Sequence, residues 1–120
     1  MELCPEMPAD CLFCRMASGE IPVAKLHEDE LVFAIRDINP QAPTHVLVLP
    51  VAHVQSAAEL TEADAPLLGR LLGVARKIAA DDGLDGGWRL VSNVGPDGGQ
   101  TVAHLHLHLL GGRPMHWPPG

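Results

Sequence analysis

A run of alternating histidine and leucine near the end of the chain constrains its fold more than any other feature. In His104-Leu-His-Leu-His108 the polar and apolar residues alternate strictly. Because successive side chains of a β-strand point to opposite faces, we expect a strand over 103–110 with its three imidazoles on one face and its leucines toward the core. Three histidines in register are costly for structure alone, since they repel one another once protonated below their ordinary pKa of about 6.5. The run therefore predicts either a metal site or nucleophilic and acid–base catalysis.

The rest of the sequence predicts an α+β fold around this strand. Between Thr61 and Gly83 apolar residues recur at helical spacing, with Thr61 and Asp64 favouring a capped start and Gly83 a left-handed stop. A short helix is predicted over 10–18, with Asp10 as its N-cap. Five strands are predicted, over 23–28, 31–36, 45–51, 88–93 and 103–110. We expect a five-stranded antiparallel meander with the long helix lying across it.

Composition limits the class of protein. A chain of 120 residues with 47% hydrophobic side chains has the length of one domain and can bury a core without disulfides. Its formal net charge of −7 opposes attraction to nucleic acid or to an anionic membrane, so we expect neither as a partner. Residues 1–9 contain acids and prolines in place of the basic start and apolar run of a signal peptide. We therefore expect one domain over 1–120, a flexible tail at 1–9 and a cytoplasmic location.

A glycine-rich loop comes directly before the histidine run. Gly98 and Gly99 allow backbone N–H groups to approach a ligand closely, and Gln100 and Thr101 add side-chain donors. Phosphate is the anion that such a loop suits. The loop has no P-loop lysine, so an ordinary turn is the competing interpretation.

Four separated motifs resemble one known family. They are His104-Leu-His-Leu-His-Leu-Leu110, Asp37-Ile-Asn-Pro-Gln-Ala-Pro-Thr-His45, Asp97-Gly-Gly-Gln-Thr101 and the ending Gly111-Gly-Arg-Pro-Met-His-Trp-Pro-Pro-Gly120. Together they resemble the histidine triad (HIT) nucleotide-binding proteins, and specifically the Hint branch, over about residues 10–120. The ending argues against the dinucleoside polyphosphate hydrolase branch, which stays open as an alternative function.

The resemblance implies a purine nucleoside phosphoramidase. His106 would be the nucleophile that attacks the α-phosphorus and forms a nucleotidylated histidine, which water then hydrolyses without a catalytic metal. His45 and His108 would hydrogen-bond the phosphoryl oxygens, and the Thr101 hydroxyl would lie by the leaving nitrogen. Acyl-phosphate substrates remain open as well.

The resemblance also implies the nucleotide contacts. Asp37 would accept hydrogen bonds from the ribose hydroxyls, and Asn93, Gly99 and Gln100 would surround the phosphate and ribose. The apolar pocket for the base would be formed by Leu12, Phe13, Met16, Ile21, Ile38 and Leu47. For these six residues ordinary core packing is the competing interpretation, since aliphatic residues usually face inward.

The cysteines suggest a second site. Three cysteines are too few for a disulfide framework, and the spacing Cys11-x-x-Cys14 suits a metal or redox pair. No thioredoxin-like βαβ pattern accompanies it, so zinc fits better, with His53 and His104 completing a closed structural Cys₂His₂ site as in many bacterial-type members of the family. Cysteines buried by coincidence are the alternative. Cys4 is expected to be a tail residue.

A homodimer is the assembly that the resemblance implies. The 111–120 segment is too rich in proline for regular structure, and Trp117 would be unusual if left in water. In the Hint branch this segment lies near the partner subunit's active site, where Trp117 would help to select leaving groups. Two other functions stay open: a nucleotide-sensing or scaffold protein with incidental hydrolysis, and a zinc-stabilised binding module in which all three histidines of the run hold metal.

Overall fold

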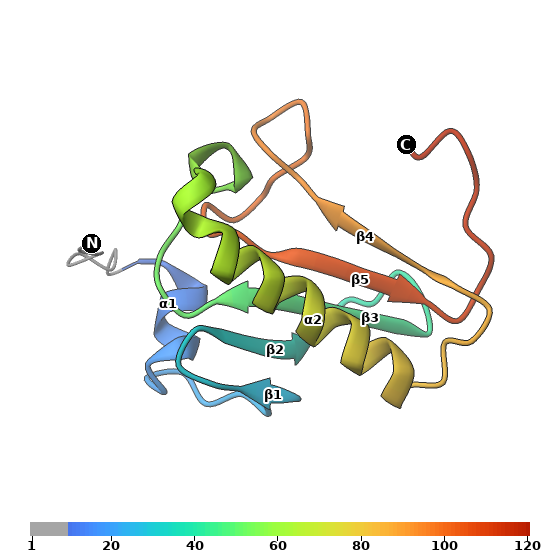
Figure 1. Ribbon diagram of the computed structural model, residues 1–120, viewed down its shortest axis with the longest axis horizontal. Helices are drawn as coiled ribbons and strands as arrows, with labels where there is room; N and C mark the ends of the chain where they lie inside the picture. Colours follow the sequence, from blue (N-terminus) through green and yellow to red (C-terminus); the bar gives the residue numbers. More distant parts are fainter. Residues whose placement is uncertain (1–9) are drawn as a thin grey trace.

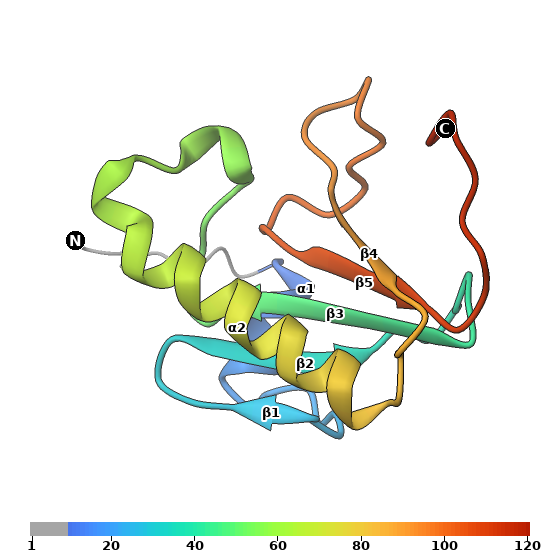
Figure 2. The same ribbon diagram turned by 45° about the vertical axis from the view of Figure 1, so that its right-hand side comes forward.

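Two helices cover opposite faces of a five-stranded antiparallel sheet (Figures 1 and 2). The computed structural model describes residues 10–120, so the expected tail and Cys4 lie outside the described residues. The helices are α1, Leu12–Ala17, and α2, Ala65–Asp81, and two 3₁₀ turns, Ala57–Glu59 and Glu62–Asp64, precede α2. The strands are β1 His27–Glu28, β2 Val32–Arg36, β3 Thr44–Pro50, β4 Trp88–Ser92 and β5 Leu107–Gly111. The predicted α+β class is confirmed.

The strands lie in the order β1-β2-β3-β5-β4, and every neighbouring pair is antiparallel. The first three strands form the expected meander. β5 then inserts between β3 and β4, so the meander is interrupted there and β4 lies at the edge of the sheet. This order places Leu47 of β3 opposite His108 of β5, away from both edges.

Alternate side chains of β2 and β3 face different helices. One set packs with the apolar face of α2: Val32, Ala34, Val46 and Val48. The other set packs with α1: Phe33, Ile35, Leu47 and Leu49. Neighbouring side chains of a strand point to opposite faces, and both faces of these central strands are covered by a helix. Their sequences are therefore nearly continuous runs of apolar residues.

The capping residues predicted for the long helix act one turn earlier than expected. Thr61 and Asp64 form a reciprocal capping box, but it closes the 3₁₀ turn at 62–64. α2 begins after it, with Pro66 in its first turn, where no N–H is needed. The helix ends as predicted, because Gly83 adopts a left-handed φ of +71° directly after it. Within the described part of the chain, no helix combines the length and apolar content that crossing a membrane requires.

The predicted N-cap of the short helix is wrong by one residue. Cys11, and not Asp10, caps α1, and its Sγ accepts from the backbone N–H of Cys14 at 3.3 Å. A sulfur that faces the first turn can hold this position because it accepts a hydrogen bond, although weakly. The shift brings the two cysteines of the pair to one end of α1.

The last strand also starts later than predicted. The expectation was 103–110, but β5 begins at Leu107. Continuing the pairing of β3 with β5 by two residues would set Leu105 opposite Pro50. Proline has no N–H to give to the ladder, and Leu105 donates its own N–H to the Val54 carbonyl at 2.6 Å.

The histidine run nevertheless keeps its predicted alternation. Leu105 and Leu109 are buried in the core under α2. On the α1 side the Phe13 ring packs edge-on against His104 and His106, with ring centroids 5.7 and 5.1 Å apart. The imidazoles therefore share one face, as the sequence predicts, although two of them precede the strand.

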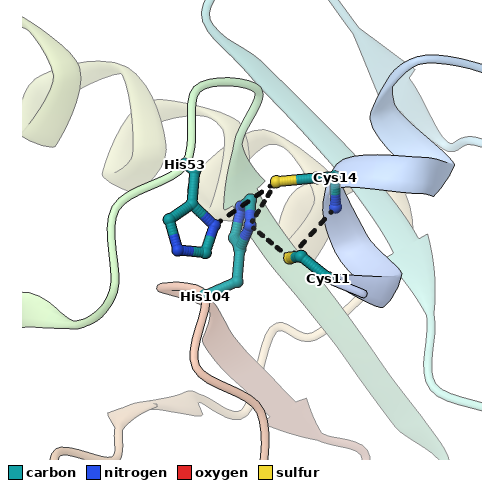
Figure 3. A group of neighbouring side chains, drawn as sticks. All are labelled: Cys11, Cys14, His53 and His104. Atoms are coloured by element: carbon teal, nitrogen blue, oxygen red, sulfur yellow. Dashed lines mark hydrogen bonds between the residues drawn. The ribbon is translucent and has the colours of Figure 1, made fainter. Parts of the chain in front are cut away.

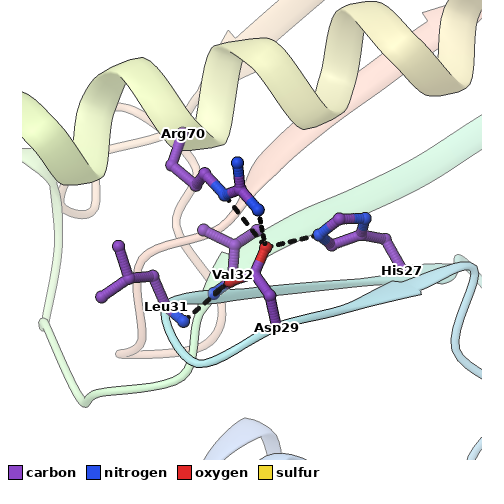
Figure 4. A network of polar contacts seen from close by, with 5 residues as sticks. All are labelled: His27, Asp29, Leu31, Val32 and Arg70. Atoms are coloured by element: carbon purple, nitrogen blue, oxygen red, sulfur yellow. Dashed lines mark hydrogen bonds and ion pairs between the residues drawn. The ribbon is translucent and has the colours of Figure 1, made fainter.

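Two polar clusters tie α2 to the sheet. Arg36 donates to both carboxylate oxygens of Asp82 at 3.0 and 3.1 Å, and the Thr44 hydroxyl donates to the same carboxylate at 3.0 Å. At the other end of the helix, Arg70 donates to Asp29 in the turn between β1 and β2 (Figure 4). These contacts fix the helix relative to β2 and β3, the strands that support the site.

Candidate active site and metal cluster

A cavity of about 190 Å³ lies between α1, the strands β2 and β3, and the segment that leads into β5. Nine residues proposed from the sequence line it: Leu12, Phe13, Met16, Asp37, Ile38, Leu47, Thr101, His106 and His108. The lining combines aliphatic and aromatic side chains with two imidazoles and one carboxylate. This mixture suits a ligand with a flat apolar part and an anionic group.

His106 is oriented by a neighbouring backbone group. The residue is 7% exposed, and its Nδ1 lies 2.7 Å from the carbonyl oxygen of His104. A carbonyl only accepts, so in the neutral ring Nδ1 holds the proton and Nε2 keeps a lone pair. His106 therefore has the unprotonated nitrogen that a nucleophile requires.

A chain of hydrogen bonds sets the tautomers of two further imidazoles. The backbone N–H of Gln41 donates to His45 Nδ1 at 3.0 Å, so the proton of His45 is on Nε2. That Nε2–H donates to His108 Nδ1 at 2.9 Å, which leaves the proton of His108 on its own Nε2. His108 lies beside His106, with 5.0 Å between ring centroids, and offers an N–H donor. The resemblance implies that His45 donates a hydrogen bond to the phosphoryl oxygens. In the structure, its Nε2–H donates to His108.

Burial keeps both rings neutral. Burial lowers the pKa of His45, against the nearby Asp37, whose carboxylate lies 3.4 Å from His45 Nε2 and raises it. Burial also lowers the pKa of His108 to about 4, with smaller contributions from His106 and His45 and again against Asp37. At neutral pH each ring therefore has one donor and one acceptor, which the hydrogen-bond chain requires.

The same contacts argue against a metal ion on Asp37, His45 and His108, whose ligand atoms lie within 4.8 Å of one another. A metal on His45 Nε2 would displace the proton there, while Nδ1 already accepts from Gln41. The ring would then hold no proton and would be an imidazolate, whereas metal-binding histidine is ordinarily neutral. These residues fit a hydrogen-bond relay.

Cys11, Cys14, His53 and His104 converge on one point (Figure 3). Cys11 Sγ lies 3.3 Å from His104 Nδ1, and Cys14 Sγ lies 3.3 Å from His53 Nδ1 and 3.5 Å from His104 Nδ1. With zinc bonds of about 2.3 Å to sulfur and about 2.05 Å to nitrogen, a tetrahedron has sulfur–nitrogen edges of about 3.5 Å. The four side chains are thus spaced as a Cys₂His₂ zinc site.

A hydrogen bond to the Pro50 carbonyl leaves His104 with an unprotonated nitrogen that can bind a metal. The residue is fully buried, and its Nε2 donates to the Pro50 carbonyl at 2.9 Å, so Nδ1 is unprotonated on the side of the sulfurs. Burial lowers the pKa of His104 to about 4, although the Pro50 carbonyl raises it, and the ring is neutral at pH 7. The donor set fits a structural zinc ion, and four protein ligands leave no open position for chemistry.

The Gln100 side chain, which is expected to lie around the phosphate and ribose, holds the glycine-rich loop together. The amide oxygen of Gln100 accepts from the Gly95 N–H at 3.1 Å. Its amide nitrogen donates to the carbonyls of Gln55 and Val102 at 2.8 and 2.9 Å. Gln100 therefore joins the loop to the segment after β3, and a direct contact with a nucleotide stays a prediction.

Glycine is required at two positions of this loop. A Cβ at Gly98 would lie 2.3 Å from the Val94 carbonyl oxygen, and Gly99 has a φ of +81°. Thr101, at the end of the loop, lines the cavity, which places a hydroxyl beside the imidazoles. The close contact of Gly98 with Val94 and the positive φ of Gly99 therefore account for glycine at these positions without a ligand.

Five of the proposed nucleotide contacts do not line the cavity within the described chain: Ile21, Asn93, Gly99, Gln100 and Trp117. Trp117 is 81% exposed, and the Arg89 guanidinium lies 5.9 Å from its ring. Three lining residues were missed: Ile35, Arg36 and Val102. Ile35 is opposite Leu47 in the β2–β3 register, so the alternation of the 31–36 strand contained the signal for it.

Comparisons with known proteins agree with this geometry. The family model of the HIT domain matches residues 18–115. An uncharacterised HIT-like protein of Synechococcus elongatus is 49% identical over 114 residues, which covers 95% of this chain and 100% of the relative. A 14 kDa zinc-binding protein of Zea mays is 49% identical over 111 residues, which covers 91% of this chain and 87% of the relative.

Solved structures share the whole arrangement of sheet and helices. A HIT family hydrolase from Legionella pneumophila superposes with a TM-score of 0.90 and 51% identity, over 92% of this chain and 100% of its own. A histidine triad nucleotide-binding protein from Candida albicans superposes with a TM-score of 0.77 and 30% identity, over 91% and 83%.

Proposed function

The chain belongs to the HIT domain family, and we propose that it hydrolyses purine nucleoside phosphoramidates through a covalent adduct on His106. The observation that supports this most directly is the 2.7 Å contact from His106 Nδ1 to the His104 carbonyl, which leaves Nε2 unprotonated in a residue lining the cavity. A neutral imidazole with a lone pair is a good nucleophile at neutral pH.

In the first step the nucleotidyl group moves to His106. Nε2 attacks the α-phosphorus, the bond from phosphorus to the leaving nitrogen breaks, and its electron pair departs with that nitrogen. The nitrogen needs a proton to leave as an amine, and the Thr101 hydroxyl in the cavity is the proposed relay that passes this proton on from solvent water. As the ring gains positive charge, the hydrogen bond from Nδ1 to the His104 carbonyl becomes charge-assisted and strengthens.

In the second step water attacks the phosphorus, the bond to Nε2 breaks with its electron pair returning to Nε2, and the proton lost by the water goes to solvent, which balances the proton taken up in the first step. One phosphoramidate and one water thus give one mononucleotide and one amine, with His106 restored. The Nε2–H of His108 donates to a phosphoryl oxygen in both steps and stabilises the charge that develops there. His45 acts through His108, because it determines which nitrogen of that ring holds the proton.

The remaining contacts complete the proposal. The apolar lining of the cavity would receive the purine base, and Asp37 would accept from the ribose hydroxyls. The 111–120 segment, with Trp117, would reach the active site of a second subunit in a homodimer and select leaving groups. A cytoplasmic location is consistent with a metal site that needs reduced thiols. The proposal includes acyl phosphates as a second class of substrate, because attack by His106 at the α-phosphorus is the same step when the leaving atom is oxygen.

Replacement of His106 by Asn tests the proposal. We expect turnover of adenosine phosphoramidate, followed by ³¹P NMR, to fall by on the order of 10³-fold or more, with AMP binding and the fold retained. His27→Asn is the matched control, since His27 lies in β1 and does not line the cavity. Near-normal turnover in His106→Asn removes the mechanism. Tight AMP binding with no turnover in the unmodified chain favours the nucleotide-sensing alternative.

A further inference from the structure

We propose that the metal cluster controls the reactivity of His106, and that His104 is the positioning residue joining the two sites. The inference rests on the proposed function, in which His106 is the nucleophile. It assigns to the cluster a role in the reaction that a purely structural metal site lacks.

His104 belongs to both sites at once. Its Nδ1 faces the sulfurs of Cys11 and Cys14, and its Nε2 is bound to the Pro50 carbonyl, so the ring has no freedom to turn. The main-chain carbonyl of the same residue is the acceptor for His106 Nδ1. A ligand of the cluster therefore also supplies the group that keeps the proton off Nε2 of the nucleophile.

The backbone that bears this carbonyl depends on the cluster for its position. The ladder between β3 and β5 begins only at Leu107, so His104 precedes the regular pairing of the sheet. The N–H of the next residue, Leu105, donates to Val54 at 2.6 Å. Val54 directly follows His53, which is another ligand of the cluster. Two contacts that position this segment, the His104 ring at the cluster and the Leu105 hydrogen bond to Val54, thus lead back to the cluster, and the third joins His104 Nε2 to Pro50.

A second route passes through α1. Phe13 lies between the two cysteines in sequence and is 5% exposed. Its ring contacts both His104 and His106, at 5.7 and 5.1 Å between centroids. Since Cys11 and Cys14 hold this end of α1 against the cluster, the metal also holds Phe13 against the nucleophile. Without the metal, weak contacts between thiols and imidazoles replace the metal–ligand bonds at this end of α1, beside the apolar packing of the helix on the sheet.

The test follows the His106 ring directly and does not depend on turnover. Protein labelled with ¹⁵N at histidine is compared by long-range ¹H–¹⁵N spectra at one neutral pH, as zinc-loaded chain, as chelator-treated chain and as His53→Ala. His53→Ala removes a ligand but leaves His104 intact. We expect one tautomer of His106 with zinc, protonated on Nδ1, and a mixture of both tautomers without it. We expect kcat to fall about 10- to 100-fold in parallel, the range for partners that orient a site.

Asp29→Ala is the matched control for lost stability, because Asp29 joins the β1–β2 turn to α2 and does not line the cavity. It is expected to lower the melting temperature and to leave the His106 spectrum and kcat unchanged. If the metal-free chain unfolds, the cadmium-loaded chain gives a comparison in the folded state, with a changed His106 spectrum expected because the larger ion moves the ligands apart.

A His106 spectrum that is identical in the zinc-loaded and metal-free folded chain, or in the zinc and cadmium forms, overturns the proposal and leaves the cluster as a structural staple. Failure of the hydrolase proposal has a different signature. It would appear as no turnover in the zinc-loaded chain while the His106 spectrum still follows the metal.

Discussion

Asp29 closes the turn between β1 and β2 and joins it to α2 (Figure 4), so its replacement measures how much this network stabilises the fold. Its Oδ1 accepts from the backbone N–H groups of Leu31 and Val32 at 2.8 and 2.9 Å. Its Oδ2 accepts from Arg70 at 3.0 Å and contacts His27. The side chain is only 13% exposed, so these partners replace most of its contact with water.

The structure gives different magnitudes for two substitutions. Asp29→Ala removes two backbone hydrogen bonds to a carboxylate, about 1.5 kcal/mol each at the lower end of the range for a charged acceptor. It also removes an ion pair with the half-exposed Arg70, which contributes up to about 1 kcal/mol. The expected loss is about 3 kcal/mol, or about 12 °C in melting temperature for a chain of this length. Asp29→Asn keeps an amide oxygen for the backbone donors and should lose about 1 kcal/mol, or about 4 °C.

Thermal unfolding by circular dichroism at pH 7 and fixed protein concentration is the assay. Glu30→Gln is the control, since Glu30 is exposed, makes no ion pair within the described chain and should change stability by less than about 0.5 kcal/mol. Burial alone raises the pKa of Asp29, but hydrogen bonds from His27, Leu31, Val32 and Arg70 hold it well below its ordinary value. The stabilisation is therefore complete above about pH 4 and is lost as the pH falls further, where Asp29→Asn should approach the unmodified chain. Equal losses from Ala and Asn at pH 7 would refute the reasoning.

Gly98→Ala should destabilise the chain by about 1 to 3 kcal/mol and lower kcat, because its Cβ would lie 2.3 Å from the Val94 carbonyl oxygen and the loop before the histidine run must move. Melting temperature and steady-state kinetics measure both effects, and unchanged values would show that the loop is not shaped by this contact. The pKa of about 4 for His108 in the folded chain lies below its ordinary value, so the unfolded chain binds more protons between about pH 6.5 and 4. Urea unfolding of zinc-loaded protein should therefore give a free energy that is highest above about pH 6.5 and falls toward pH 4, whereas equal values at pH 7 and pH 5 contradict a buried neutral ring.

The histidine run shows how far a side-chain pattern can predict structure. Alternation predicted which residues face α1 and which face α2, because it depends only on the geometry of an extended chain. It did not predict that β5 begins at Leu107. That boundary depends on Pro50, 55 positions earlier than Leu105, and on a register that only the folded sheet defines.

The cysteine pair was informative for a different reason. Cys11 and Cys14 are three positions apart, so any helical turn brings them together, and the structure places both with His53 and His104. The tautomer of His45, in contrast, depends on the backbone N–H of Gln41, and a backbone donor has no signature in the sequence. The cavity's aliphatic lining was partly predicted, but Ile21 does not reach it.

Three histidines of one short run present different free nitrogens, because their hydrogen bonds differ in which nitrogen is used and in whether that nitrogen donates or accepts. His104 donates a hydrogen bond from Nε2–H to the Pro50 carbonyl, which leaves Nδ1 unprotonated for a metal. His106 donates a hydrogen bond from Nδ1–H to the His104 carbonyl, which leaves on Nε2 the lone pair that the proposed attack on phosphorus requires. His108 accepts on Nδ1 from His45, which leaves Nε2–H as a donor for an oxygen that gains charge. The alternating sequence brings three identical rings to one face, and their hydrogen-bond partners, two of them backbone carbonyls, leave each ring with the nitrogen that its proposed role as ligand, nucleophile or donor requires.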